Sequence, residues 1–232
     1  MIRQFPLDLR WPPHQRLDAF WPGANVRALQ GISDAARGAG AWLYLHGASG
    51  TGKSHLLIAA CRAALEAGRP ARYVSLAQLA APRSGVIAGI EPDGLLAIDD
   101  VQAIAGDREA ERALFDLYNR AKTANAQMLF AGNASPAELG IALPDLVSRL
   151  SMCTQYALRP LDDAGRRAML RVLAGRLGLR LDDEVLDWWF ARQPRDPASL
   201  VALLQRVDRA SLAAQRRITI PFLRELLNEG PV

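Results

Sequence analysis

The first candidate functional motif is a glycine-rich stretch, Gly47-Ala-Ser-Gly-Thr-Gly-Lys53-Ser54. It follows an apolar run and precedes an alanine-rich, helix-like run. A G-x-x-x-x-G-K-S pattern between a strand and a helix predicts a phosphate-binding loop, whose backbone N–H groups and helix N-terminus hold phosphate oxygens. Lys53 would reach the β- and γ-phosphates, and the Ser54 hydroxyl would hold Mg²⁺. We expect the nucleotide cradle to comprise Gly47, Ser49, Gly50, Thr51, Gly52, Lys53, Ser54 and His55.

The alternative is a glycine-rich turn that contains Lys-Ser by accident. Lysine usage argues against it, because only Lys53 and Lys122 are lysines among 28 basic residues. The sequence therefore favours nucleotide binding, and leaves open whether ADP or ATP is the ligand.

Two acids, Asp99 and Asp100, end the apolar run at 95–98. Paired with a phosphate loop, they predict a nucleotide-hydrolysis site in which Asp99 holds Mg²⁺ through water and Asp100 acts as general base. The alternative is a capping Asp-Asp at a strand-to-helix turn. Asn133 ends the next apolar run, where its amide could orient the attacking water, or could favour a left-handed turn before Ser135. Spacing alone does not decide between these two roles for Asn133.

The elements that must position these residues alternate along the chain. Strand-like apolar runs lie at 43–46, 72–76, 95–98, 128–131 and 152–158. Helical patterns lie between them at 25–37, 53–67, 108–123 and 144–150. This alternation predicts an α/β fold with a five-stranded parallel sheet, helices on both faces, and ligand at the carboxyl ends of the strands.

After position 160 the strand pattern stops. Apolar residues recur at helical spacing over 163–177, 183–193, 197–214 and 221–228, with Asp182, Asp183 and Pro197 as start signals and Gly178 as a stop signal. We therefore expect an extended N-terminal arm at 1–22, a nucleotide-binding domain at 23–159, and a small all-helical domain at 160–232.

Composition is typical of a cytoplasmic globular protein. The 232 residues are 50% hydrophobic, without the ~18 uninterrupted apolar residues of a membrane span. The N-terminus has no secretory core, and Cys61 and Cys153 are expected to be free buried thiols in a reducing compartment. The three histidines lack metal-ligand spacing. A net charge of +4 permits contact with nucleic acid without showing it.

Further motifs, in order along the chain, carry a specific resemblance. They are Phe20-Trp-Pro-Gly-Ala-Asn25, Ser54-His-Leu-Leu57, Phe115-Asp-Leu-Tyr-Asn-Arg120, Leu143-Pro-Asp-Leu-Val-Ser-Arg-Leu150, Leu158-Arg-Pro-Leu161, Asp208-Arg-Ala-Ser211 and Ile218-Thr-Ile-Pro-Phe222. Together with the phosphate loop and the acid pair, this set resembles the AAA+ ATPases of the DnaA branch. Within that branch it is similar to the Hda group, the factors of regulatory inactivation of DnaA.

The resemblance implies an AAA+ fold with a helical lid, and a negative regulator of replication initiation that promotes hydrolysis of ATP on the initiator DnaA. It implies that Arg149 is an arginine finger and that Phe20–Asn25 lines the adenine pocket. The alternative is a purely structural role for Arg149, in a surface ion pair with Asp145 one helical turn earlier. A nucleoid or replisome location, with DNA contacted only indirectly or non-specifically, follows from the same resemblance.

The N-terminal arm contains Gln4, Leu7 and Leu9 in a Gln-x-x-Leu-x-Leu pattern. This pattern resembles the peptide that replication proteins insert into the hydrophobic pocket of the sliding clamp, and Hda relatives carry it at the same place. Gln4 would hydrogen-bond in a polar niche while the two leucines anchor in an apolar groove. The alternative is an arm that packs on its own domain or is disordered.

Three departures from DnaA are expected. The segment 77–94 is broken by proline and glycine and does not hold the two extra helices with which DnaA grips single-stranded DNA. The chain ends at Val232, so no helix-turn-helix module and no origin recognition are expected. Ala198 stands where relatives carry a second sensing arginine, and Arg195 is a candidate substitute.

Rival interpretations are a helicase loader, a stand-alone ATPase that uses its own Asp100, and a binding module with a vestigial nucleotide. Whether the chain forms a homodimer is open at this stage.

Overall fold

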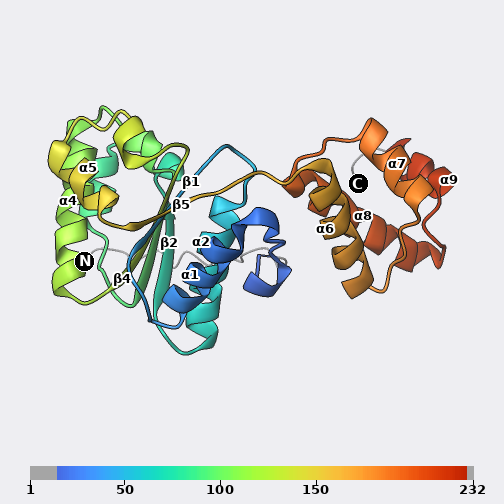
Figure 1. Cartoon of the computed structure of the whole chain (residues 1–232), viewed down its shortest axis with the longest axis horizontal. Coiled ribbons are helices and arrows are strands. Elements are labelled where there is room, and N and C mark those ends of the chain that lie inside the picture. The colour runs from blue at the N-terminus through green and yellow to red at the C-terminus, as the bar shows by residue number, and fades with distance from the viewer. Residues whose placement is uncertain (1–14, 229–232) are drawn as a thin grey trace. The chain divides into compact units, whose positions relative to one another are not determined.

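The chain divides into two units, Met1–Leu158 and Arg159–Val232. The structure, a computed structural model, describes residues 15–228 of them. Figure 1 shows a sheet with flanking helices in the first unit and helices alone in the second. No helix in the described part is both long and apolar enough to cross a membrane.

Five parallel strands form the sheet of the first unit, in the order β2-β3-β4-β1-β5. The strands are β1 (Leu43–His46), β2 (Ala71–Ser75), β3 (Leu95–Asp99), β4 (Gln127–Gly132) and β5 (Thr154–Ala157). The predicted α/β class with a five-stranded parallel sheet is thus confirmed. Because all strands run the same way, the phosphate loop after β1, the acids at the end of β3 and Asn133 after β4 meet at one edge of the sheet.

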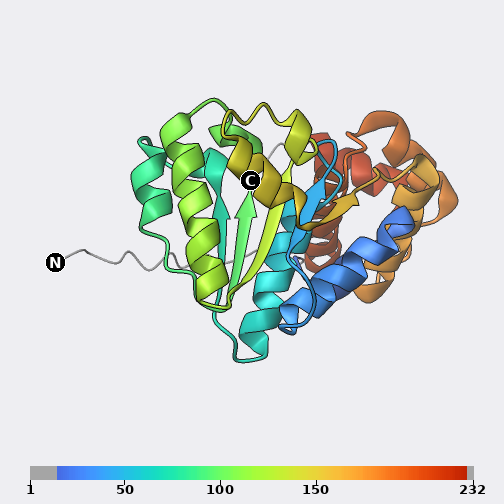
Figure 2. The same cartoon turned by 60° about the vertical axis from the view of Figure 1, so that its left-hand side comes forward.

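Helices cover both faces of this sheet, as Figure 2 shows. One apolar cluster joins one sheet face to α1 and α2, and a second joins the other face to α3, α4 and α5. These helices are α1 (Val26–Ala36), α2 (Lys53–Glu66), α3 (Arg83–Ala88), α4 (Arg108–Thr123) and α5 (Pro144–Ser151). The central strands β3 and β4 are buried along their whole length, which explains their continuous apolar sequences.

The segment between β2 and β3, which proline and glycine interrupt, contains the short helix α3. Pro82 and Gly89 lie at its two ends, so only Gly85 interrupts the helix itself. Arg120 on α4 donates to the carbonyls of Ala88 and Ile90, which satisfies the C-terminal end of α3. A single six-residue helix leaves no room for two full ones, as expected.

The second unit contains four helices within its described residues 159–228: α6 (Asp163–Arg176), α7 (Asp183–Arg192), α8 (Pro197–Ala214) and α9 (Ile220–Asn228). Asp162 and Asp196 cap α6 and α8 by accepting the N–H groups of Gly165 and Ser199. Gly178 follows α6 with a φ of 74°, where glycine avoids strain. The predicted all-helical organisation of this part is confirmed.

Candidate nucleotide-binding site

The loop between β1 and α2 has the backbone of a phosphate cradle. Gly47, Gly50 and Gly52 have φ values of 146°, 77° and 93°, which side-chain-bearing residues rarely adopt. A Cβ on Gly47 would lie 2.6 Å from the Leu158 carbonyl oxygen. A Cβ on Gly52 would lie 2.6 Å from Cε2 of Phe20. Two of the glycines are therefore required by close packing as well as by backbone conformation.

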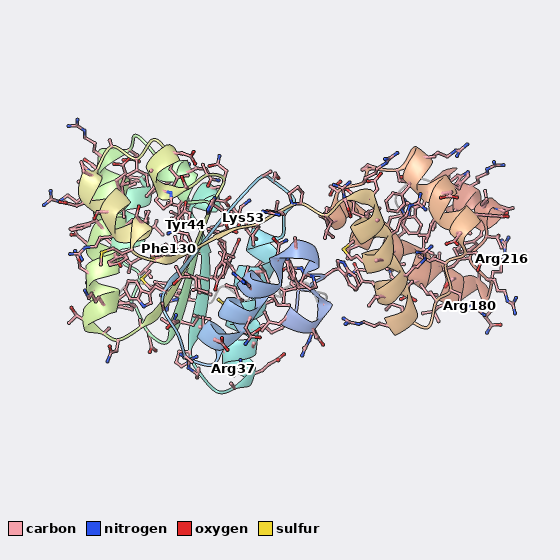
Figure 3. All side chains as sticks on the ribbon, viewed as in Figure 1. Arg37, Tyr44, Lys53, Phe130, Arg180 and Arg216 are labelled. Atoms are coloured by element: carbon pink, nitrogen blue, oxygen red, sulfur yellow. The ribbon has the colours of Figure 1, made fainter. Side chains whose placement is uncertain are left out.

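Lys53, labelled in Figure 3, begins α2 and turns back over this loop. Its Nζ donates to the carbonyls of Gly47 at 2.7 Å and Ala48 at 2.9 Å. Burial lowers the pKa of the Lys53 ammonium, while the nearby Asp99 and Asp100 oppose that shift. The ammonium therefore lies within the field of both acids.

Asp99 is buried at the end of β3, with 1% of its surface exposed. One oxygen accepts the Tyr73 hydroxyl at 2.7 Å, and the other accepts the Asp100 N–H at 2.8 Å. Burial raises the pKa of Asp99, and hydrogen bonds from Ser54 and Tyr73 oppose that rise. The structure thus brings Ser54 and Asp99 together, as expected for a magnesium site. A hydroxyl and one carboxylate leave room for phosphate and water oxygens, which suits Mg²⁺.

Asp100 follows in the left-handed region at φ 58°, an uncommon backbone for a residue with a side chain. Its carboxylate accepts Ser75 Oγ at 2.7 Å and Gln102 Nε2 at 3.2 Å. Gln102 Oε1 in turn accepts the backbone N–H of Asn133 at 3.2 Å. A chain of hydrogen bonds therefore connects the ends of β2, β3 and β4.

The residues that donate hydrogen bonds to the two acids were not predicted from the sequence; they are Tyr73, Ser75 and Gln102. The side chain of Asn133, which was expected beside the acids, is exposed, and its backbone N–H makes the link to Gln102. Asn133 thus lies at the predicted edge, and its role there is a prediction.

The remaining cradle residues hold the loop and the segment that precedes it. Thr51 Oγ1 donates to the Ala48 carbonyl at 2.9 Å inside the loop. His55 Nε2 lies 3.0 Å from the carbonyl of Arg16, and its ring lies 5.5 Å from that of Phe20. His55 thus connects α2 to residues 16–20, which pack over the end of the loop.

Arg149 lies on α5 and is half-buried. Its guanidinium carbon lies 5.9 Å from the ring centroid of Tyr118, above the ring face. No described residue accepts a hydrogen bond from the Arg149 side chain, and no ion pair with Asp145 forms. The surface ion pair, the alternative interpretation of this arginine, is therefore absent. A half-buried guanidinium without an acceptor has its donors available for a ligand.

Known structures share the fold of this chain. The replication initiator DnaA bound to AMPPCP and single-stranded DNA is 23% identical with a TM-score of 0.70, over 84% of this chain and 65% of that one. Domain III of Thermotoga maritima DnaA is 21% identical with a TM-score of 0.73, over 95% and 99%. The Thermotoga maritima RuvB branch migration motor is 17% identical with a TM-score of 0.64, over 92% and 71%. This chain thus spans about two-thirds of the length of the first of these proteins.

The helical unit gives the more specific match, because residues 163–227 fit the family model of the Hda lid domain. The chain thus shares the AAA+ fold of DnaA, and its helical unit matches the Hda lid domain. The α/β fold and the all-helical part that the sequence predicted thus both have counterparts among known proteins.

Inside the lid, Arg195 is already held by its own unit. Its Nε donates to the Phe190 carbonyl at 2.9 Å, and its Nη1 lies 2.7 Å from Oδ2 of Asp163. Ala198 lies in the first turn of α8, as the sequence indicated. The substitution of Arg195 for a sensing arginine stays a prediction that would require these contacts to break.

Gln4, Leu7 and Leu9, which the sequence predicts to bind the sliding clamp, lie outside the described residues.

Proposed function

We propose that this protein is a nucleotide-bound regulator of replication initiation. It docks on the DNA-loaded sliding clamp through Gln4, Leu7 and Leu9, and it promotes hydrolysis of ATP held by DnaA. The observation that carries the proposal is Arg149, a half-buried arginine with no acceptor among the described residues, in a chain with an Hda-type lid. The planar guanidinium would enter the nucleotide site of DnaA and neutralise charge that develops on the γ-phosphate.

In this proposal the protein's own phosphate loop holds ADP or ATP. Support comes from the positive-φ glycines, from Lys53 beside the acid pair, and from the known DnaA structure bound to AMPPCP. Ser54 and Asp99 would hold Mg²⁺, whose charge would be shared with the phosphates. Bound nucleotide would stabilise the AAA+ unit that carries α5, by mass action on its folded state.

The proposal is tested by following ADP formation on DnaA. Purified DnaA is loaded with labelled ATP and mixed with clamp-loaded DNA, with and without this protein. We expect strong stimulation by the full chain, and its loss when residues 4–9 are deleted, because docking raises the effective concentration of the two partners. The control protein keeps residues 4–9 and carries Arg72→Ala, a change at an exposed residue on the edge strand β2. A folded, nucleotide-bound protein that gives no stimulation would overturn the proposal and favour helicase loading.

A second candidate, a stand-alone ATPase, is favoured by the complete set of Lys53, Asp99 and Asp100 at one edge of the sheet. It requires ATP turnover by the purified chain alone, abolished by Lys53→Ala. Regulation of DnaA instead requires that this chain still stimulate hydrolysis of DnaA-bound ATP when the chain itself turns over no ATP.

Replacing Tyr73 with phenylalanine is expected to weaken binding of Mg²⁺-nucleotide by about three- to tenfold near neutral pH. The Tyr73 hydroxyl opposes the rise in the pKa of Asp99 that burial causes, so its removal raises that pKa further. Mg²⁺ requires the ionised carboxylate, and acidification therefore weakens binding, at higher pH in the variant than in the wild type. The measurement is a Mg²⁺ titration with fluorescent ADP at a series of pH values.

The control for this experiment is Tyr156→Phe, since Tyr156 lies on β5 away from the acids. In the metal-free protein the raised pKa means that the contribution of Asp99 to stability is lost as the pH rises through its folded pKa. Coincident pH profiles for Tyr73→Phe and wild type would show that the phenol does not tune the acid.

A further inference from the structure

Helix α4 touches α5 at both ends through two buried side chains. Glu111 and Tyr118 lie seven residues apart, two helical turns, so they lie on the same face of α4. Glu111 is 0% exposed and Tyr118 is 6% exposed. A fully buried glutamate on an apolar helix face requires a specific partner.

Glu111 finds its partners at the start of α5. Its two carboxylate oxygens accept the N–H groups of Ala142 at 2.9 and 3.0 Å and of Leu143 at 2.8 Å. The same carboxylate accepts the N–H of Gly106 at 2.8 Å, in the loop that follows the acid strand. One side chain therefore fixes the entry to α5 relative to the loop beyond Asp99 and Asp100.

Tyr118 lies under the last turn of α5. The guanidinium carbon of Arg149 lies 5.9 Å above its ring. The ring itself is fixed, because Trp42 packs edge-on at 4.6 Å and Phe130 stacks at 6.2 Å with 16° between the planes. The Trp42 ring is held in turn by a 3.1 Å hydrogen bond from Nε1 to the Ala126 carbonyl. Arg149 thus rests on a rigid aromatic support that belongs to the core.

The contact between Arg149 and the Tyr118 ring determines which groups of Arg149 stay available to a ligand. A cation–π contact needs no hydrogen-bond acceptor, so it leaves the N–H donors of the guanidinium unpaired with protein oxygens. A carboxylate partner at the same place would occupy those donors and would compete with a phosphate. The geometry therefore holds Arg149 in place without blocking the hydrogen bonds that an arginine finger must make.

We propose that Tyr118 is a positioning residue for Arg149, and that Glu111 and Tyr118 together set the orientation of the α5 helix that carries it. This inference rests on the proposed function, because the partner is the nucleotide site of a second AAA+ protein. The ring restricts the guanidinium to the orientation that meets the γ-phosphate, so less rotamer freedom is lost when the composite site assembles.

The test compares three replacements of Tyr118 in the full chain, with hydrolysis of DnaA-bound ATP as the readout. Tyr118→Phe keeps the ring face and is expected to retain the stimulation. Tyr118→Leu removes the ring face and is expected to lower the stimulation about 3- to 30-fold, with unchanged binding to DnaA and clamp. Tyr118→Met also removes the ring but fills more of the space that the tyrosine occupied, so it replaces Tyr118→Leu in the test if the leucine variant does not fold. Tyr156→Leu, on β5, is the control for loss of an aromatic ring elsewhere in the first unit.

A double-mutant cycle distinguishes positioning from a general structural role. If Tyr118 acts through Arg149, adding Tyr118→Leu to Arg149→Ala causes no further loss of stimulation. A further loss of the same size as in the single variant would overturn the inference, as would full stimulation by a folded Tyr118→Leu or Tyr118→Met protein. Both results leave the proposed function standing, because that function fails separately, when the folded, nucleotide-bound wild-type protein gives no stimulation.

Discussion

Replacing Arg149 with alanine is expected to lower the stimulated rate of ATP hydrolysis on DnaA by about a thousandfold, the lower end of the range for arginine fingers in other nucleotide hydrolases. The variant is expected to fold normally, because the Arg149 side chain makes no hydrogen bond to a described residue and contacts only the ring of Tyr118. The effect should therefore appear in the chemical step. Single-turnover hydrolysis of labelled ATP on DnaA measures it, with complex formation on clamp-loaded DNA measured in parallel.

Two further variants make this result specific to the guanidinium. Arg149→Lys keeps the charge and loses the planar fork, so it should restore only part of the rate. Arg72→Ala removes an exposed arginine from β2, at the opposite edge of the sheet from β5, and should behave like wild type. Normal stimulation by a folded Arg149→Ala protein would show that the finger is another residue or that no finger is supplied by this chain.

The chemistry of the nucleotide site could be predicted where it depends on local sequence. The phosphate loop is a contiguous motif, and Asp99 and Asp100 directly follow an apolar run. Two of their partners, Tyr73 and Ser75, could not be found in the same way, because they come from a neighbouring strand. Tyr73 and Ser75 reach the acids only because β2 pairs with β3 in the register Ser75↔Asp99. Strand order and register are tertiary properties that a single sequence does not specify.

Helix α3 illustrates how breaker residues mislead. Pro82 and Gly89 within a dozen residues favour a loop, yet they serve as the two caps of a short helix. The apolar side chains Ile87 and Ile90 are buried in the core beside α4, and this packing stabilises a helix that its own propensity would not. The predicted strand at 152–158 was also too long, since Met152 caps α5 and β5 begins at Thr154.

The position of Glu111 in the sequence could have indicated its buried role. It lies on the stripe formed with Leu114, Tyr118 and Ala121, all of them buried, so a charged residue interrupts an otherwise apolar helix face. Such an interruption predicts a buried carboxylate with fixed donors. The donors themselves, in the turn before α5, could be identified only from the structure.

Replacing Glu111 with alanine is expected to lower the free energy of unfolding of the AAA+ unit by about 1–3 kcal/mol, the cost of leaving hydrogen-bond donors without their acceptor. The N–H groups of Gly106, Ala142 and Leu143 would lose their acceptor, and the packing around the missing side chain would loosen. Because the chain has two units, amide hydrogen exchange of β3 and β4 is the suitable measurement, since it reports on the AAA+ unit alone.

The matched control is Asp116→Ala, which removes an exposed acid from the same helix and should change the free energy of unfolding by no more than about 0.5 kcal/mol. Glu111→Gln should fall between the two, because one oxygen still accepts while the amide group faces N–H donors. If Glu111→Ala left exchange in β3 and β4 unchanged, the turn before α5 would have to be held by other contacts. The carboxylate would then not set the path of the chain toward Arg149, and the support of α5 by α4 would depend on Tyr118 alone.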